Sequence, residues 1–347
     1  MALPTVITTI DTSAAIGDIE VNPITNRVYF VHPDTTAGTV GVLNTLTHRI
    51  IATIQVGRLP LKLAINPRTN RVYVTNFRDG TLSVINGRTN SVIKTIKVGI
   101  NPDSVSVNVR TNLIYVSSAS GFVTVIDGRT NCIRTRIQIG GRPSAIVVNK
   151  RTHRIYVTNI INDSVSVING STQAVISTVK VGSNPVTTPA LNPITNRVYV
   201  ANNLSPFLSV INGRTNKLLK NIQLGRLQSQ VIVNPLTNRI YVASAQIEQE
   251  GTLFVINGAT QKVITTKKLS TFSSIFINPI TNHLFVSNFS QDRLSVYNAS
   301  TFKKIAVFPF VSGVNIALNP LTNRLYVANS KYVTVIQDGP RLKHNTK

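Results

Sequence analysis

A nine-residue element, Asn-Pro-x-Thr-Asn-Arg-Val-Tyr-Val or a close variant, recurs along the chain and constrains its fold more than any other feature. Its first Asn stands at eight positions that are 41 to 44 residues apart: Asn22, Asn66, Asn108, Asn149, Asn192, Asn234, Asn278 and Asn319. A period in the low forties that contains only strand-like segments is typical of β-propeller blades with four strands each. The repetition therefore predicts one repeat architecture for the 347 residues.

The second unit shows how each repeat divides into four strands, here called A to D. Alternating and β-branched runs predict these strands over 61–65, 71–75, 82–85 and 91–98. The turns between them contain Pro, which fixes φ, and Asn and Gly, which tolerate the left-handed conformations of tight hairpins. No segment has the period of an amphipathic helix, so the chain is expected to be all-β.

The number of predicted strands gives the number of blades. Eight A–B hairpins and eight C strands are present, but only seven D strands follow a C strand. The segment 5–10 resembles the D strand at 91–98, so we expect the N-terminus to supply the outer strand of the last blade and to close the ring. We predict an eight-bladed propeller over residues 1–339, with seven blades as the alternative, and a basic, disordered tail over 340–347.

Three copies of the repeat carry a family resemblance. Residues 71–76 read Arg-Val-Tyr-Val-Thr-Asn, and 154–159 and 197–202 are close variants. These segments resemble the Tyr-Val-Thr-Asn (YVTN) β-propeller repeat family. The resemblance implies a propeller fold, most commonly with seven blades, and members that are often exported or surface-associated with interaction functions. The sequence begins without a recognisable secretory signal, so we expect a cytoplasmic location, with an extracellular or cell-surface location as the alternative if the sequence is a trimmed piece.

The balance of charge indicates the class of partner. Lys and Arg number 36 against 12 Asp and Glu, which gives a formal net charge of +24. Such an excess favours a polyanion: nucleic acid, an acidic polysaccharide or an anionic membrane surface. The alternative is that the charge serves only solubility. No apolar run is long enough for a membrane-spanning helix, and we expect a monomer.

Propeller geometry sorts the loops onto two faces. The A–B and C–D turns share one face, here called the basic face, and the B–C turns and D-to-A links share the other, here called the mixed face. We expect the Arg that follows Thr-Asn in the repeat to be structural. Better candidates for binding a polyanion stand elsewhere in the turns of the basic face: Arg68, Arg88, Arg110, Arg129, Arg151 and Arg214.

The mixed face contains most of the acidic residues and a similar number of basic ones. The aromatic residues expected to be exposed there are Phe77, Phe207 and Phe289. Because they lie away from the arginines, we do not expect them to stack on bases, and we expect contact with the nucleic-acid backbone instead. The alternative function is a protein-binding or surface-associated propeller that uses the mixed face.

The inner strands line the central channel and contain one charged cluster, formed by Asp18, Glu20 and Lys62. It could bind a small ligand or act in acid–base chemistry, but we favour a structural ion pair. An enzyme at the channel mouth that uses Asp18, Glu20 and His32 is the least favoured hypothesis. No histidine pair has metal-ligand spacing, so we expect no catalysis, metal or cofactor, and we expect the single cysteine, Cys132, to lie in the core.

Overall fold

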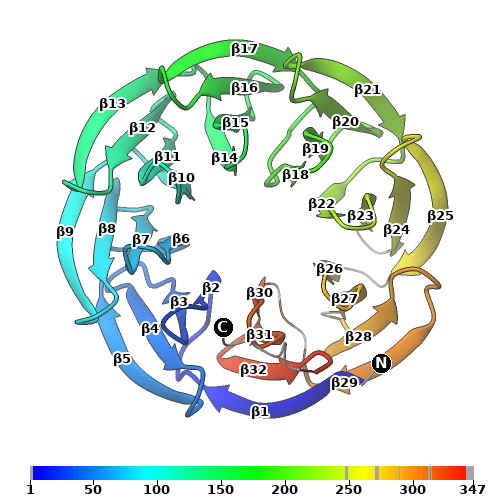
Figure 1. Ribbon diagram of the computed structural model, residues 1–347, viewed down its shortest axis with the longest axis horizontal. Helices are drawn as coiled ribbons and strands as arrows, with labels where there is room; N and C mark the ends of the chain where they lie inside the picture. Colours follow the sequence, from blue (N-terminus) through cyan, green and yellow to red (C-terminus); the bar gives the residue numbers. More distant parts are fainter. Residues whose placement is uncertain are drawn as a thin grey trace, which may run out of the picture.

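The computed structural model describes residues 3–246, 249–269, 273–288, 290–311, 313 and 315–340. Within these ranges, 32 strands form eight antiparallel sheets of four strands each, arranged as a ring around a central channel (Figure 1). The same ranges contain no helix, and hence none long and apolar enough to cross a membrane. The all-β, eight-bladed prediction is confirmed and the seven-bladed alternative is wrong. Most of the predicted tail, residues 341–347, lies outside the described residues.

Seven blades each take four consecutive strands, in the order A, B, C and D from the channel outward. The first four blades comprise β2 (Ile19–Asn22), β3 (Arg27–His32), β4 (Thr39–Asn44) and β5 (Arg49–Gln55); β6 (Pro60–Asn66), β7 (Arg71–Asn76), β8 (Thr81–Asn86) and β9 (Ser91–Lys97); β10 (Pro102–Asn108), β11 (Leu113–Ser118), β12 (Phe122–Asp127) and β13 (Cys132–Gln138); and β14 (Pro143–Asn149), β15 (Arg154–Asn159), β16 (Ser164–Asn169) and β17 (Ala174–Lys180). The next three comprise β18 (Ala190–Asn192), β19 (Arg197–Val200), β20 (Phe207–Asn212) and β21 (Lys217–Gln223); β22 (Gln228–Asn234), β23 (Arg239–Gln246), β24 (Gln249–Asn257) and β25 (Lys262–Leu269); and β26 (Ser273–Asn278), β27 (His283–Asn288), β28 (Arg293–Asn298) and β29 (Lys304–Pro309).

The eighth blade joins the two ends of the chain. It combines β30 (Asn315–Asn319), β31 (Arg324–Asn329) and β32 (Tyr332–Gln337) with β1 (Thr5–Asp11) as its outer strand (Figure 1). β1 runs antiparallel to β32, with Thr5 opposite Gln337 and Asp11 opposite Tyr332. The predicted closure of the ring by the N-terminal strand is confirmed, and it leaves β32 without an open edge.

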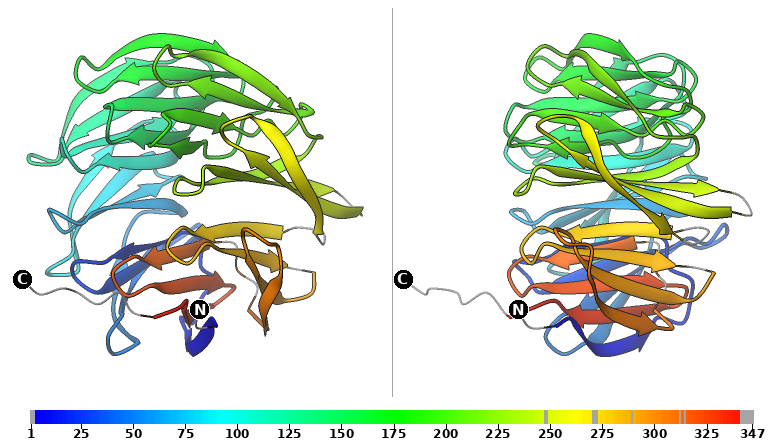
Figure 2. Two further views of the ribbon diagram at one scale, coloured as in Figure 1. Left: turned by 45° about the vertical axis from the view of Figure 1, so that its right-hand side comes forward. Right: turned by 90° about the vertical axis from the view of Figure 1, so that its right-hand side faces the viewer.

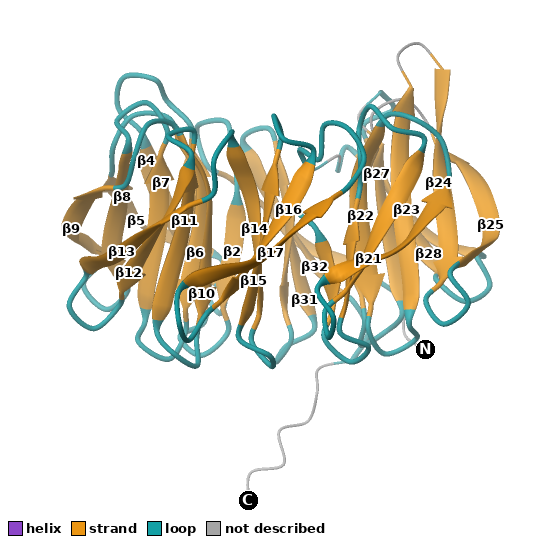
Figure 3. Ribbon diagram, turned by 90° about the horizontal axis from the view of Figure 1, so that it is seen from above, coloured by secondary structure: helices purple, strands orange, loops and turns teal. Residues whose placement is uncertain are grey.

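The hairpins on the basic face follow the chemistry of their turn residues. The last residue of the A–B turn has a left-handed backbone in every blade, with φ between 49° at Asn70 and 55° at Asn26 in the first two. Asn tolerates this conformation at low cost, which explains its recurrence at the end of the turn. Figures 2 and 3 show the ring from the side, with the A–B and C–D turns along its lower edge in Figure 3.

Asparagines also connect neighbouring blades. In six of the eight blades, the first Asn of one A–B turn donates its side-chain N–H to the last Asn of the next, as in Asn22 Nδ2 to Asn70 Oδ1 at 3.0 Å and Asn192 Nδ2 to Asn238 Oδ1 at 2.8 Å. The first Asn of each turn is fully buried, so these bonds satisfy amides that water does not reach. The two asparagines of the repeat therefore both shape the turn and join the blades into a ring.

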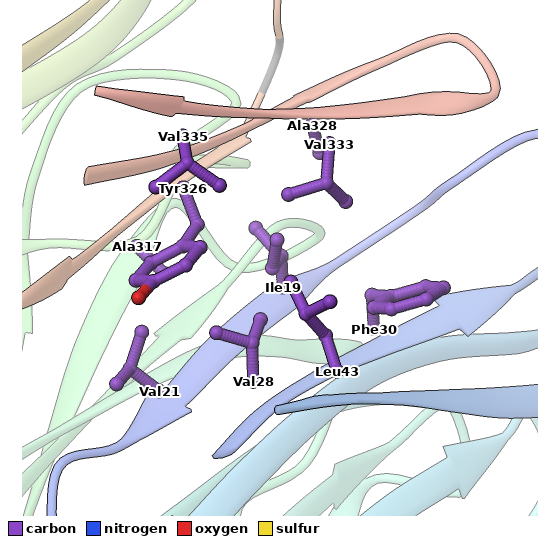
Figure 4. Packing of buried hydrophobic residues seen from close by; sticks show 10 residues of the cluster. All are labelled: Ile19, Val21, Val28, Phe30, Leu43, Ala317, Tyr326, Ala328, Val333 and Val335. Carbon is purple, nitrogen blue, oxygen red and sulfur yellow. The ribbon is translucent and has the colours of Figure 1, made fainter. Parts of the chain in front are cut away.

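The apolar core lies between blades. Figure 4 shows the cluster where the eighth blade meets the first: Tyr326 of β31 packs among Val21, Val28 and Leu43 of the first blade. The Tyr of the repeat is completely buried wherever it occurs, at Tyr29, Tyr73, Tyr115, Tyr156, Tyr199, Tyr241 and Tyr326. Because each blade buries its large side chains against its neighbour, the ring is stabilised as a whole.

Two expectations about single residues are wrong. Cys132 is exposed, because it begins β13, an outer strand, instead of lying between blades. Phe77 and Phe207 are half-buried instead of exposed. Phe289 lies outside the described residues. Among the residues that the structure describes, the most exposed aromatic side chain is that of Phe310, which follows β29 and is 80% exposed.

Candidate polyanion-binding face

The turns of the basic face share one local geometry. The first residue, Asn or Asp, accepts through its side-chain oxygen the backbone N–H of the third residue, as in Arg68 N to Asn66 Oδ1 at 3.1 Å. This bond closes a small ring that fixes the turn and leaves the third side chain projecting from it. We call the third residue the tip. All six candidate arginines occupy tips, with bonds of 2.8 to 3.1 Å: Arg68, Arg88, Arg110, Arg129, Arg151 and Arg214.

The six tip arginines are exposed, and their side chains make few contacts with the rest of the protein. Arg129 forms an ion pair with Asp127 at 3.3 Å, and its side chain remains 79% exposed. Arg110 has one long contact, Nη1 to the Lys150 carbonyl at 3.5 Å. Across the described residues, no side-chain hydrogen bond or ion pair engages Arg68, Arg88, Arg151 or Arg214. Their guanidinium groups are free to meet a ligand.

The two carboxylates described on this face, those of Asp127 and Asp338, are engaged in hydrogen bonds within the protein. Asp127 accepts the backbone N–H and the guanidinium of Arg129, and these bonds lower the pKa of its carboxyl. Asp338 is completely buried and contacts Nδ1 of His283 at 2.6 Å. The described part of the basic face therefore has little negative charge to offset its arginines.

Two of the tip arginines converge on a groove between the fourth and fifth blades. Arg151 and Arg214 line a depression of about 600 Å³ together with Arg197, Thr195 and Asn212. The arginines provide charge, and the threonine and asparagine provide further polar groups. A groove of this composition can hold an anionic group.

Four of the recurrent arginines have the structural role expected of them, whereas Arg71 and Arg154 form no such bond within the described part of the chain. Arg27 donates through Nη1 to the Gly87 carbonyl and to Asn90 Oδ1, both at 2.7 Å, in the C–D turn of the next blade. Arg239 reaches the Ala299 carbonyl at 2.7 Å, and Arg324 reaches the Thr45 carbonyl at 3.1 Å. Arg197 donates in the same way to the carbonyl of Gly258. These side chains fasten one blade to the next.

The seventh blade replaces this arginine with His283. The histidine is buried and pairs with Asp338, which also accepts hydrogen bonds from Asn278 Nδ2 and Thr281 Oγ1, each at 2.6 Å. The pair holds the segment after β32 against the seventh blade, so it has the same fastening role. Sequence reasoning missed it, because the two residues lie 55 positions apart and only the ring brings them together.

In the channel, Asp18 acts as a brace between blades. Its carboxylate contacts Lys62 Nζ at 3.4 Å and accepts the backbone N–H of Leu63 at 3.0 Å. Gln230 holds the equivalent place in the sixth blade and accepts the N–H of Ile275 at 2.8 Å. The same contact in a blade without a carboxylate supports the structural interpretation of Asp18 and Lys62.

Glu20 lies deeper in the channel, beside a cavity of about 350 Å³ that Lys62 and Lys150 also line. The Glu20 side chain is accessible to the water in the channel. The protein around the channel still removes part of the hydration of its carboxylate, and this desolvation, together with the charge of Asp18, raises the pKa of Glu20 to about 7. The sequence analysis did not place Lys150 in the channel. The one signal that could have marked it is that it stands where the repeat usually has Pro.

The enzyme hypothesis requires Asp18, Glu20 and His32 to meet at the channel mouth, and the structure does not bring His32 to that place. His32 bonds Thr39 Oγ1 at 3.1 Å on the neighbouring strand, burial lowers its pKa, and it does not line the channel cavity. Among the described residues, no group of three His, Cys, Asp or Glu side chains is placed to hold a metal ion.

The comparisons with known proteins agree with this architecture. A family model described as YNCE-like beta-propeller matches residues 22–188, which confirms the resemblance to β-propellers of the YVTN type. A search of curated proteins finds no match. Among solved structures, hydrazine synthase of Kuenenia stuttgartiensis aligns with a TM-score of 0.62 and 16% identity, over 81% of this chain and 96% of that one.

A second solved structure is dihydro-heme d1 dehydrogenase NirN in complex with DHE. It aligns with a TM-score of 0.68 and 15% identity, over 85% of this chain and 66% of that one. At such low identity, the two likenesses show the propeller fold alone.

Proposed function

We propose that the protein is a non-enzymatic binding scaffold whose basic face binds a polyanion. The observation that carries the proposal is the set of six exposed arginines at equivalent turn tips. The turns fix the backbone beneath each arginine, so the charges form a preorganised array on one side of the ring. An array of this kind binds repeated negative charges without reading a sequence.

The turns also explain why charge is compatible with the fold at these positions. A tip side chain takes no part in the turn bond, which uses only the backbone N–H of that residue. The fold therefore leaves the tip free to vary, and the concentration of arginine at tips of the second to fifth blades supports a binding role. The excess of +24 over the whole chain adds long-range attraction to such a partner.

Fluorescence anisotropy with labelled duplex DNA, measured over a series of salt concentrations, tests the proposal. We expect binding that weakens with salt, with a slope of roughly 0.9 per phosphate neutralised. Replacement of all six tip arginines by Gln should abolish most of the affinity and flatten the slope. A chain that ends at residue 340 serves as the control for attraction by the basic tail.

A protein partner on the mixed face is a second candidate, favoured by one observation. Phe310 is 80% exposed on that face, where an unpaired aromatic side chain is a common anchor for a partner. If this function is correct, Phe310→Ala weakens capture of the partner and the six-arginine variant does not.

A further inference from the structure

We infer that the basic face docks on an anionic lipid bilayer, an inference that rests on the proposed function and names the polyanion. The observation behind it is the identity of the tips that are not arginine. In most of the remaining turns the tip is an exposed aliphatic residue held by the same backbone bond of 2.9 to 3.2 Å: Ile24, Leu46, Ile194, Leu236, Ile280 and Leu321. Their exposed fractions run from 37% for Leu321 to 69% for Leu236.

At the A–B turns, the two kinds of tip occupy separate sectors of one face, and Arg214 at the C–D tip of the fifth blade lies where the two sectors meet. Arginine holds the A–B tips of the second, third and fourth blades, at Arg68, Arg110 and Arg151. Isoleucine or leucine holds the A–B tips of the fifth to eighth blades and of the first. Because the ring is closed, each sector is continuous, and the two adjoin on the same side of the molecule.

Exposed aliphatic side chains also lie on the rim, in both sectors. Two consecutive ones follow the C–D turn, as Leu218 and Leu219 do in β21 of the aliphatic sector and Val175 and Ile176 do in β17 of the arginine sector. A β-bulge at Leu219 and at Ile264 interrupts the alternation of the strand at this point. At about 3.3 Å per residue, these side chains lie within roughly 7 Å of the turn.

Lysines and an arginine border the aliphatic sector. Arg49, Lys217, Lys262 and Lys304 begin the outer strands of the first, fifth, sixth and seventh blades, and all are exposed. Basic groups beside apolar groups of shallow depth match the headgroup region of an anionic bilayer. There the aliphatic side chains enter the acyl boundary by about 5–10 Å, and the basic residues are attracted to the anionic headgroups.

A nucleic acid explains the arginine sector but not the aliphatic one. Exposed isoleucine and leucine at rigid tips cannot pair with phosphates, and they give no platform for stacking bases. In water they would form an apolar patch without a partner. A bilayer of anionic lipid satisfies both sectors at once, so the observations favour it over nucleic acid.

The chain contains no Trp, so one introduced Trp reports insertion directly. Leu236→Trp places the probe at an aliphatic tip, and Ile161→Trp is the matched control, because Ile161 is also 69% exposed but lies in a B–C turn on the mixed face. With vesicles of phosphatidylcholine and phosphatidylserine, we expect a blue shift of emission for Leu236→Trp and none for Ile161→Trp. Vesicles of phosphatidylcholine alone should give no shift.

A second variant separates the lipid from other polyanions. Replacing Ile24, Leu236 and Leu321 by Ser should weaken binding to the phosphatidylserine vesicles by about tenfold or more in flotation, and leave the affinity for duplex DNA unchanged. If both probes stay unshifted while duplex DNA binds, the lipid inference fails and the proposed function stands. If neither vesicles nor DNA bind, both fail.

Discussion

At the scale of single residues, the asparagine that ends each A–B turn has two roles. Asn70 adopts a left-handed backbone with φ of 49° and accepts the amide of the buried Asn22 at 3.0 Å. Asn70 therefore contributes to stability through both its backbone conformation and its side-chain hydrogen bond. Two substitutions at this residue can separate the two contributions.

Asn70→Ala should destabilise the fold more than Asn70→Gly. Both variants lose the bond to Asn22, at a cost of about 1–3 kcal/mol for an amide left unpaired. Alanine adds about 1–2 kcal/mol for the left-handed backbone, which glycine adopts freely. The free energy of unfolding from urea titration measures the difference. Equal losses for the two variants would show that backbone conformation contributes nothing here.

Glu20 should make stability depend on pH. Its pKa in the folded state is about 7, above the ordinary value of 4.5, so folding favours the protonated form. That advantage is complete below pH 4.5 and is lost as the pH rises through about 7. Glu20→Gln should therefore raise the melting temperature at about pH 8 and change it little at about pH 4. A gain of the same size at both pH values would contradict this explanation.

At the scale of elements, the outer strands differ most from what the sequence predicts. The turns and strands of each blade could be predicted because Asn, Pro and Gly stand at fixed places in the repeat. The bulge at Leu219 could not, because it depends on register with β20, which the residues of β21 alone do not set. Contacts such as His283 with Asp338 or Lys150 with the Glu20 cavity were likewise invisible, since they join residues distant in sequence.

The closing strand β1 gives a prediction at this scale. Removal of residues 1–11 should lower the melting temperature and cause association that increases with concentration, because β32 then has an open edge. A synthetic peptide of residues 3–12 added in trans should reverse both effects. Light scattering and thermal melts report the outcome, and a shortened chain that stays monomeric with an unchanged melting temperature would contradict the closing role.

At the scale of the whole molecule, repetition separates stability from binding. Asn, Tyr and Arg of the repeat join neighbouring blades, and the tips beside them take no part in those contacts. The ring can therefore carry arginine in one sector and aliphatic residues in another without loss of the fold. The six candidate arginines could be predicted because they stand outside the repeated Arg position. Their shared position at the turn tips became clear only from the structure, because hydrogen bonds within the turns define it.

The most direct test of the binding face compares two variants of equal charge. Replacing Arg68, Arg88, Arg110, Arg151 and Arg214 by Gln removes five charges from the basic face, and replacing Arg58, Arg78, Arg142, Arg226 and Arg293 removes five from the mixed face. Affinity for duplex DNA at fixed, moderate salt is then measured for both. A loss confined to the first variant is the result that we predict. Equal losses would show that only net charge matters and would contradict a binding face.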